Sequence, residues 1–282
     1  MGRRCQDDQS EQLGEGLKDK GKRLSQSKAD RMGFIDIHCH ILPGLDDGPE
    51  TIEQSLEMLK IAADDGISHI FCTPHVYPGV YDNNTAGIRR AVDELQKRAE
   101  NDVSLYSGGD VRVVPDLVQR VARGDAPTLD GSPYLLLEFP SQFIPPYTSR
   151  LIFDLRQNGL IPIVTHPERY AYFAKDFTPL KILREQGCLF QLTAMSFSKN
   201  VHKEVRKNTL AMMKKGFVDF IASDAHSSSH RIPVLSQAYE EVQRVLGKEI
   251  AHKIFFENPQ NIVKSIAHEI RHPQEPAYYT SR

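Results

Sequence analysis

Histidine and carboxylate residues recur along the sequence in short motifs, each close to the end of an apolar run. The first motif is FIDIHCHILPGLDDG, in which His38 and His40 are followed by Asp46 and Asp47. The motifs FCTPH, SGGD, LLLEFP, IVTHPERY and FIASDAH contribute His75, Asp110, Glu138, His166, Asp224 and His226. Imidazole and carboxylate groups are common ligands of divalent metal ions. These residue types therefore indicate metal-dependent chemistry.

Each of these residues also has a structural explanation when it is taken alone. His75 follows Thr-Pro and could belong to a turn, Glu138 could form a salt bridge in the core, and Asp224 could cap a helix. That explanation weakens if all the motifs lie at the same end of successive strands. Five histidines and four carboxylates gathered in one place would repel each other or stay unsatisfied without cations.

The ligand types restrict which metal such a site would hold. A mixture of imidazole and carboxylate that needs no thiolate suits Mn, Fe or Zn better than Ca or Mg. Nine or so ligands exceed what a single ion requires, so we expect two or three ions. Clustered ions can activate water at neutral pH and hold phosphate oxygens. Cys39 lies between His38 and His40, and on an extended strand it points to the opposite face, so we interpret it as a core residue.

The elements that would position these motifs alternate in type from Gly33 onward. A capping box of Thr51 and Gln54 opens an amphipathic helix after the first run. The apolar runs are Phe34–His38, Ile67–Cys72, Val103–Tyr106, Tyr134–Phe139, Leu160–Val164, Cys188–Leu192 and Phe217–Ala222. Seven strand-then-helix units predict a parallel α/β sheet, most simply a closed barrel. The carboxyl ends of barrel strands share one face, so the motifs would converge there.

The composition is that of a soluble globular protein. The chain has 282 residues, of which 40% are apolar and 26% charged, and its net charge is −2. This length is ordinary for a single α/β barrel. The balanced charge offers no basic surface for nucleic acid or anionic lipid, and no apolar run is long enough to cross a bilayer. We therefore expect no nucleic-acid partner and no membrane insertion.

The cysteines bear on both compartment and mechanism. Cys5, Cys39, Cys72 and Cys188 are scattered without the spacing of a disulfide framework, and no signal-peptide core follows the start. Both features favour a reducing cytoplasm. No cysteine is followed by an arginine six residues later. The loop of the cysteine-dependent tyrosine phosphatases is therefore absent.

The two ends of the chain differ from its body. Residues 1–31 contain very few apolar side chains, so we predict a disordered N-terminal tail, with a regulatory or targeting arm as the alternative. Met32 would then be the functional beginning. We predict a barrel over residues 32–272 and a short C-terminal tail over residues 273–282.

The motifs DIHCHILPGLDDG, TPH, LLLEFP, HPERY and SDAH, in this order and spacing, resemble the polymerase and histidinol phosphatase (PHP) superfamily. They are most similar to its manganese-dependent bacterial protein-tyrosine phosphatases, which are associated with capsule and exopolysaccharide operons. The resemblance extends from Met32 to about Ile270. It implies a distorted (βα)7 TIM-like barrel, the PHP fold, with Mn²⁺ as the cofactor and Fe or Zn as alternatives.

The resemblance also implies roles for individual residues. The nine ligands would form three groups: His38, His40 and Asp224 for the first ion, Glu138 and His166 for the second, Asp47, His75 and His226 for the third, and Asp110 bridging the first two. Arg169 and Arg231 correspond to the family's phosphate-binding arginines. The family usually has Glu where this chain has Asp110, and the shorter side chain could loosen the bridge or alter the metal preference.

The activity predicted from the motifs and the resemblance is hydrolysis of a phosphomonoester. The expected substrate is phosphotyrosine on a bacterial tyrosine kinase that controls capsule or exopolysaccharide synthesis. A histidinol-phosphate or other small-molecule phosphatase would use the same site. A catalytically weak metal-binding regulatory module is the third reading, and it would bind metal without turnover.

Overall fold

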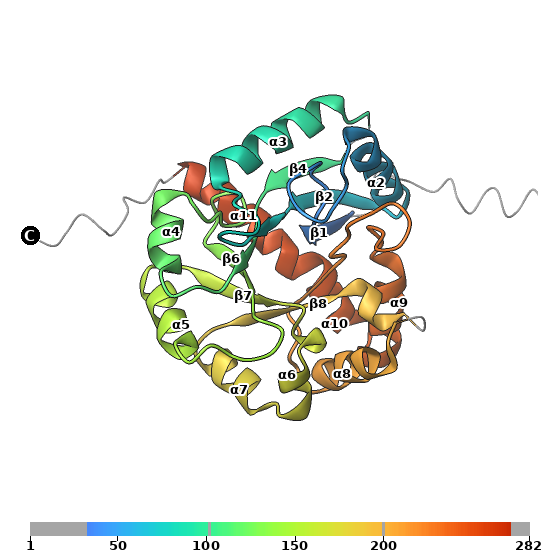
Figure 1. The fold of residues 1–282 in the computed structure, drawn as a ribbon. Coiled ribbons are helices and arrows are strands. Elements are labelled where there is room, and N and C mark those ends of the chain that lie inside the picture. The colour runs from blue at the N-terminus through green and yellow to red at the C-terminus, as the bar shows by residue number, and fades with distance from the viewer. Residues whose placement is uncertain (1–32, 101–102, 199–200, 272–282) are drawn as a thin grey trace, which may run out of the picture. The chain divides into compact units, whose positions relative to one another are not determined.

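Parallel strands build the framework of the molecule, and helices cover their outer side (Figure 1). The structure is a computed structural model that describes residues 33–100, 103–198 and 201–271. The tails predicted for residues 1–31 and 273–282 therefore lie outside the described residues. The strands are β1 (Phe34–Cys39), β2 (Ile67–Cys72), β3 (His75–Val76), β4 (Ser104–Ser107), β5 (Asp110–Arg112), β6 (Tyr134–Glu138), β7 (Ile161–Thr165), β8 (Leu189–Thr193) and β9 (Phe220–Ala222).

Two of the strands continue beyond their predicted ends after a break of two residues. β3 continues β2 after Thr73 and Pro74, and β5 continues β4 after Gly108 and Gly109. The strand orders are β1-β2-β4 and β3-β5-β6-β7-β8-β9, and every pair of neighbours is parallel. The two breaks lie side by side, because β2 pairs with β4 before them and β3 pairs with β5 after them. The seven predicted strands are therefore present, and two of them have an additional short segment after a break.

The curved sheet meets itself at the carboxyl ends of its first and last strands. Cys39 forms a parallel bridge with Ala225, just beyond β9. The Asp224 N–H donates to the His38 carbonyl at 2.8 Å, and the His40 N–H donates to the Ala225 carbonyl at 2.8 Å. This closure confirms the predicted distorted (βα)7 barrel and brings two of the predicted metal-binding motifs into direct contact.

The helices lie between and after the strands, as the strand-then-helix order requires. Thr51 and Gln54 form the predicted capping box at the start of α2, with Gln54 N 3.4 Å from Thr51 Oγ1 and Thr51 N 3.4 Å from Gln54 Oε1. The α-helices are α2 (Ile52–Asp64), α3 (Thr85–Arg98), α4 (Leu117–Arg123), α5 (Thr148–Gln157), α6 (Ala171–Lys175), α7 (Thr178–Glu185), α8 (Lys203–Lys214), α9 (Ser236–Leu246), α10 (Lys248–His252) and α11 (Asn258–Arg271). Shorter helical turns are η1 (Pro167–Arg169), η2 (Ala194–Phe197) and η3 (Lys253–Glu257).

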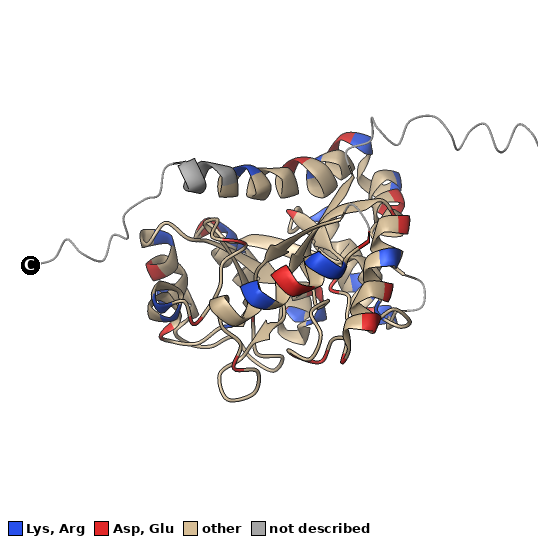
Figure 2. Cartoon of the chain, turned by 90° about the horizontal axis from the view of Figure 1, so that it is seen from above, with Lys and Arg blue, Asp and Glu red and all other residues tan. Residues whose placement is uncertain are grey.

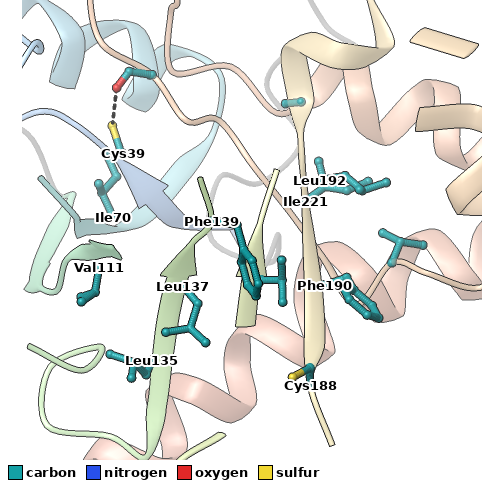
Figure 3. Packing of buried hydrophobic residues seen from close by; sticks show 14 of the residues in the cluster. Cys39, Ile70, Val111, Leu135, Leu137, Phe139, Cys188, Phe190, Leu192 and Ile221 are labelled. Atoms are coloured by element: carbon teal, nitrogen blue, oxygen red, sulfur yellow. Dashed lines mark hydrogen bonds between the residues drawn. The ribbon is translucent and has the colours of Figure 1, made fainter. Parts of the chain in front are cut away.

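The strands are apolar on both faces because they are covered on both sides. In β6, Leu136 belongs to an inner cluster, whereas Leu135 and Leu137 belong to the larger outer cluster between strands and helices (Figure 3). The inner cluster also receives Ile262 and Ile266 from α11. The Asn258 side chain at the start of α11 donates to the carbonyl of Asp219, the residue before β9, at 2.7 Å. The amino-terminal side of the barrel is therefore packed, and the carboxyl ends are left for polar groups.

Acidic and basic residues are interspersed along the helices (Figure 2), in keeping with the near-zero net charge. Among the described helices, none is long and apolar enough to cross a membrane.

Candidate metal centre

His38 and His40 reach the barrel mouth because β1 contains an irregularity in its pairing. Asp36 pairs with Ile70 and Cys39 with Cys72, so β1 uses three residues where β2 uses two. The extra residue changes the alternation of side chains along the strand. Ile35 and Ile37 lie in the inner cluster. Because of the irregularity, His38 and His40 follow them on the same side of the strand. Cys39 is fully buried in the outer cluster, as the sequence predicts.

Hydrogen bonds fix both histidines in the orientation that a metal ligand needs. His38 Nδ1 lies 2.8 Å from Gln191 Oε1, and His40 Nδ1 lies 2.6 Å from Asp46 Oδ2. The Gln191 amide nitrogen donates to the Leu192 carbonyl, so its oxygen faces His38. Each Nδ1 is therefore the donor, and each Nε2 carries a lone pair. Burial lowers the pKa of both histidines, which keeps them neutral.

The two Nε2 atoms converge on one point. They lie 3.0 Å apart, and each is 3.6 Å from Asp224 Oδ1. Two lone pairs that face each other beside a carboxylate oxygen are unfavourable without a cation between them. This arrangement fits the predicted first ion.

Asp110 lies at the centre of the cluster. Its Oδ1 accepts a hydrogen bond from Thr165 Oγ1 at 3.0 Å, whereas its buried Oδ2 has no hydrogen-bond partner among the described residues. That oxygen is 3.7 Å from His38 Nε2 and 3.6 Å from both His75 Nδ1 and His166 Nε2. Burial alone would raise the pKa of Asp110, but the facing imidazoles, His38 first, outweigh burial and lower it. A carboxylate in this position can bridge metal ions.

A further group of ligands lies around Asp47. Asp47 Oδ1 is 3.5 Å from His75 Nε2 and 3.4 Å from His226 Nε2. His226 Nδ1 lies 3.0 Å from the Asp224 carbonyl and donates to it, which leaves Nε2 free. The proximity of His226 lowers the pKa of the half-exposed Asp47 to about 2. Asp47 is therefore ionised at neutral pH.

Glu138 ends β6 on the other side of His75. Its Oε2 lies 3.7 Å from His75 Nδ1 and 3.4 Å from Arg112 Nη1. Burial, followed by the charge of Asp110, raises the pKa of Glu138. The Arg112 side chain also donates to the Phe139 carbonyl at 3.0 Å, so it anchors the end of the strand that carries Glu138.

Asp224 connects the candidate ligands to two arginines. Its Oδ2 lies 2.7 Å from Arg169 Nη1 and 2.8 Å from Arg231 Nη2. Burial opposes ionisation of Asp224, but the arginines and His38 hold its pKa well below the usual range. Asp224 and His166 both have positive φ angles, +51° and +36°, which is uncommon outside glycine. Such backbone strain often occurs at functional sites.

Three sets of potential ligand atoms lie within 4.8 Å of one another: His38, His40 and Asp110; His75, Asp110 and Glu138; His40, Asp47, His75 and His226. These sets differ in detail from the predicted groups. His75 faces Asp110 and Glu138 as well as Asp47, and His166 approaches Asp110 without joining a set. Pairwise approaches of 3.4–3.8 Å link all nine predicted residues into one network. Within the part of the chain that the structure describes, the buried Asp110 Oδ2, His75 Nδ1, His166 Nδ1 and His226 Nε2 have no hydrogen-bond partner. The donor set thus fits divalent metal ions, and the ligand roles stay predictions.

The sequence analysis gave no role to several supporting residues. Asp46 orients His40 and also accepts from the His75 backbone N–H at 2.9 Å, and its place as the first aspartate of the LDDG motif was the available signal. Asp36 Oδ1 accepts from the Ser223 N–H at 2.9 Å, which ties β1 to the end of β9. Gln191 lies in an apolar strand, and its polar side chain at a core position was the signal there. Nothing in the sequence marked Arg112.

Comparisons with known proteins agree with the fold and the site. Residues 34–264 match the family model described as capsular polysaccharide synthesis, CpsB/CapC. The chain is 33% identical over 246 residues to the tyrosine-protein phosphatase YwqE of Bacillus subtilis, covering 86% of this chain and 96% of the relative. It is 30% identical over 241 residues to the tyrosine-protein phosphatase CpsB of Streptococcus agalactiae, covering 82% of this chain and 99% of the relative.

Solved structures give the same result. One matching structure comes from a study of YwqE from Bacillus subtilis and CpsB from Streptococcus pneumoniae, which are described as unique metal-dependent tyrosine phosphatases. The TM-score is 0.78 and the identity 33%, and the match covers 82% of this chain and 94% of that one. The histidinol phosphate phosphatase of Lactococcus lactis matches with a TM-score of 0.51 and 14% identity, covering 77% and 93%, and shows the fold alone. The class is that of metal-dependent hydrolases on a TIM-like barrel. Within it, this chain belongs to the CpsB/CapC family, which confirms the predicted resemblance.

Proposed function

We propose that this protein is a metal-dependent protein-tyrosine phosphatase that hydrolyses phosphotyrosine in a protein substrate. The observation that carries the proposal is a single connected set of imidazoles and carboxylates around Asp110, with two arginines directed at the same carboxylate, Asp224. The relatives named tyrosine-protein phosphatases support the choice of phosphotyrosine.

The residues at the mouth suit a phosphate dianion. Arg169 and Arg231 are 28% and 30% exposed, so part of each guanidinium faces the open side while one nitrogen holds Asp224. Arginine presents five N–H donors in a plane and can bind two phosphate oxygens at once, which lysine cannot copy. Their side chains would orient the phosphate over the ligand cluster. We assign no general acid, because a phenolate is a better leaving group than an alkoxide.

We infer that the site holds two or three Mn²⁺ ions, with Fe or Zn as alternatives. The nine proposed ligands are His38, His40, Asp47, His75, Asp110, Glu138, His166, Asp224 and His226. Bound ions would supply positive charge that activates water and polarises phosphate oxygens. Asp46 and Gln191 would hold His40 and His38 with Nε2 directed at them.

We further propose that the substrate is a bacterial tyrosine kinase that controls capsule or exopolysaccharide synthesis, and that the protein acts in the cytoplasm. Support for the pathway is the family's description as a capsular polysaccharide synthesis family. The buried free thiols of Cys39, Cys72 and Cys188 are compatible with a reducing compartment.

The test compares substrates after the metal has been removed and returned. The purified protein is stripped with a chelator, reloaded with Mn²⁺, and assayed on a phosphotyrosyl peptide, a phosphoseryl peptide and histidinol phosphate. We expect activity to disappear with the metal, to return with Mn²⁺, and to be highest on the phosphotyrosyl peptide. Higher catalytic efficiency on histidinol phosphate would replace the proposed substrate. Bound metal without turnover of any of the three would leave only a regulatory metal-binding role.

A further inference from the structure

A groove with apolar and polar lining residues lies next to two chain segments that contact Asp224. It has a volume of about 720 Å³, and its apolar lining includes Met195, Phe197 and Ile232. Met195 is 37% and Ile232 39% exposed, so both offer apolar surface to an incoming chain. Exposed apolar surface in a concave site favours binding of an apolar group.

Both sides of the groove start one residue away from a contact with Asp224. On one side, Thr193 Oγ1 lies 3.4 Å from Asp224 Oδ2, and η2 follows immediately with Ala194 and Met195. On the other side, Arg231 pairs with Asp224, and Ile232 follows. A phosphate held by Arg231 would therefore lie at the entrance of the groove.

Arg206 of α8 also lines the groove. Its Nε donates to the Phe197 carbonyl at 3.1 Å, and its Nη2 lies 3.2 Å from Glu241 Oε1 on α9. Arg206 thus links the two walls of the groove. Both contacts are made within the chain, so they hold the two walls of the groove together.

Basic side chains continue from Arg206 along α8. A second hollow of about 700 Å³ shares Val201 and Arg206 with the groove. Its other charged lining residues, within the part of the chain that the structure describes, are Lys203, Lys207 and Lys214, all basic. Lys207 lies 3.6 Å from Glu204, but both side chains are exposed, so this pair offsets only part of the basic charge. Such a surface attracts acidic groups.

We propose that this groove binds the segment of the substrate protein that flanks the phosphotyrosine, with an apolar side chain in the groove and acidic residues over α8. This inference rests on the proposed phosphatase activity and adds a sequence preference to it. The occupant is a peptide because one chain must place a phosphate at Arg231, an apolar group beside Ile232 and negative charge near Lys207.

The test uses Mn²⁺-loaded protein with free phosphotyrosine and a set of phosphotyrosyl peptides. The peptides carry leucine followed by glutamates on either side of the phosphotyrosine, or serine in place of leucine, or glutamine in place of glutamate. We expect one orientation of the leucine–glutamate peptide to have a kcat/KM about tenfold above its serine and glutamine counterparts. The part of the preference due to glutamate should weaken as salt is added.

Variants locate the effect. Met195→Asp should lower kcat/KM on the preferred peptide about tenfold and leave hydrolysis of free phosphotyrosine unchanged. Lys203→Glu with Lys207→Glu should abolish the preference for glutamate. Phe153→Asp on α5 and Lys181→Glu on α7 are the matched controls, because both positions are exposed and neither lines the groove. If Met195→Asp does not fold, Gln237→Asp places the same charge in the groove from α9.

The outcomes separate this inference from the activity on which it rests. Turnover of free phosphotyrosine with equal kcat/KM on all peptides overturns the groove alone. Equal losses by Met195→Asp on free phosphotyrosine and on peptide also overturn it, because the residue would then act on the site itself. Absence of turnover on every phosphotyrosyl substrate overturns the proposed function and this inference together.

Discussion

One oxygen of Asp110 faces three imidazoles and has no hydrogen-bond partner among the described residues, and we expect Asp110 to bridge two ions. Asp110→Ala should therefore lower the number of bound ions and reduce turnover by at least about 100-fold. Asp110→Glu should tighten metal binding, since the longer side chain matches the family pattern. Metal content per chain and kcat measure both effects. Asp116→Ala, an exposed aspartate paired with Arg120, is the control. Asp110 is not a ligand if the alanine variant keeps both its ions and its turnover.

Asp46 and Gln191 act on the histidines rather than on the metal. Asp46→Asn and Gln191→Leu should each weaken metal affinity by about 10–100-fold. Gln191→Leu removes the acceptor for His38 Nδ1, and Asp46→Asn leaves one amide oxygen where two carboxylate oxygens accept from His40 and from the Gly48 N–H. Titration of the stripped protein with Mn²⁺ measures the affinity. The loss of Mn²⁺ affinity in each variant should be at least about tenfold larger than the loss in Asp116→Asn. Unchanged affinity in both variants would mean that these hydrogen bonds only serve packing.

Replacing Arg169 with lysine tests its role in phosphate binding while its positive charge is kept. Arg169→Lys should lower kcat/KM by roughly 10–100-fold, because lysine cannot bind two oxygens in one plane. The metal content should stay at the wild-type level, which separates this effect from damage to the ligand cluster. Arg123→Lys on α4, an exposed arginine paired with Asp125, is the control. Full catalytic efficiency in Arg169→Lys would remove that residue from the phosphate site.

At the scale of elements, the interrupted strands place two ligands. Gly109 precedes Asp110, and a Cβ at Gly109 would lie 2.8 Å from Pro127 Cγ and 2.9 Å from Val76 Cγ2. Gly109→Ala should therefore cost about 1–3 kcal/mol of stability and displace Asp110 and His75, which pair across β3 and β5. Gly87→Ala in α3 is the matched control, because its Cβ meets nothing closer than 3.5 Å and alanine favours a helix.

Urea denaturation of the metal-free proteins measures this prediction. Gly109→Ala should lower the midpoint and also weaken Mn²⁺ binding, whereas Gly87→Ala should raise the midpoint slightly. A Gly109→Ala variant as stable as the wild type would show that the break between β4 and β5 tolerates a side chain. In that case the close approach of the two interruptions would not position the ligands.

At the scale of the whole molecule, the metal centre joins strands from all around the barrel. Ions bound there should stabilise the fold against heat, by about 2.7 kcal/mol when Mn²⁺ is at 100 times its dissociation constant. The melting temperature with and without Mn²⁺ measures this effect. The shift should largely disappear in His40→Ala, which removes a side chain shared by two of the ligand sets. An equal shift in that variant would locate the stabilising ions elsewhere.

The sequence by itself determined the type of chemistry and the class of fold. Residue types and strand periodicity are local properties, so the motifs after successive apolar runs already predicted a parallel barrel with imidazole and carboxylate ligands at one face. The capping box of Thr51 and Gln54 was equally local. The interruptions of two strands were not evident, because Thr-Pro and Gly-Gly read as turns when their neighbours in space are unknown.

Only the tertiary structure decided which groups share a position. His75 faces Asp110 and Glu138 as well as Asp47, because distances between side chains on different strands depend on the curvature and register of the sheet. The irregular pairing of β1, the orientation of His38 by Gln191 and the groove beside Arg231 depend on the same geometry. The sequence pattern shows which residue types lie at the end of each strand. Contacts between ends arise only when the barrel closes.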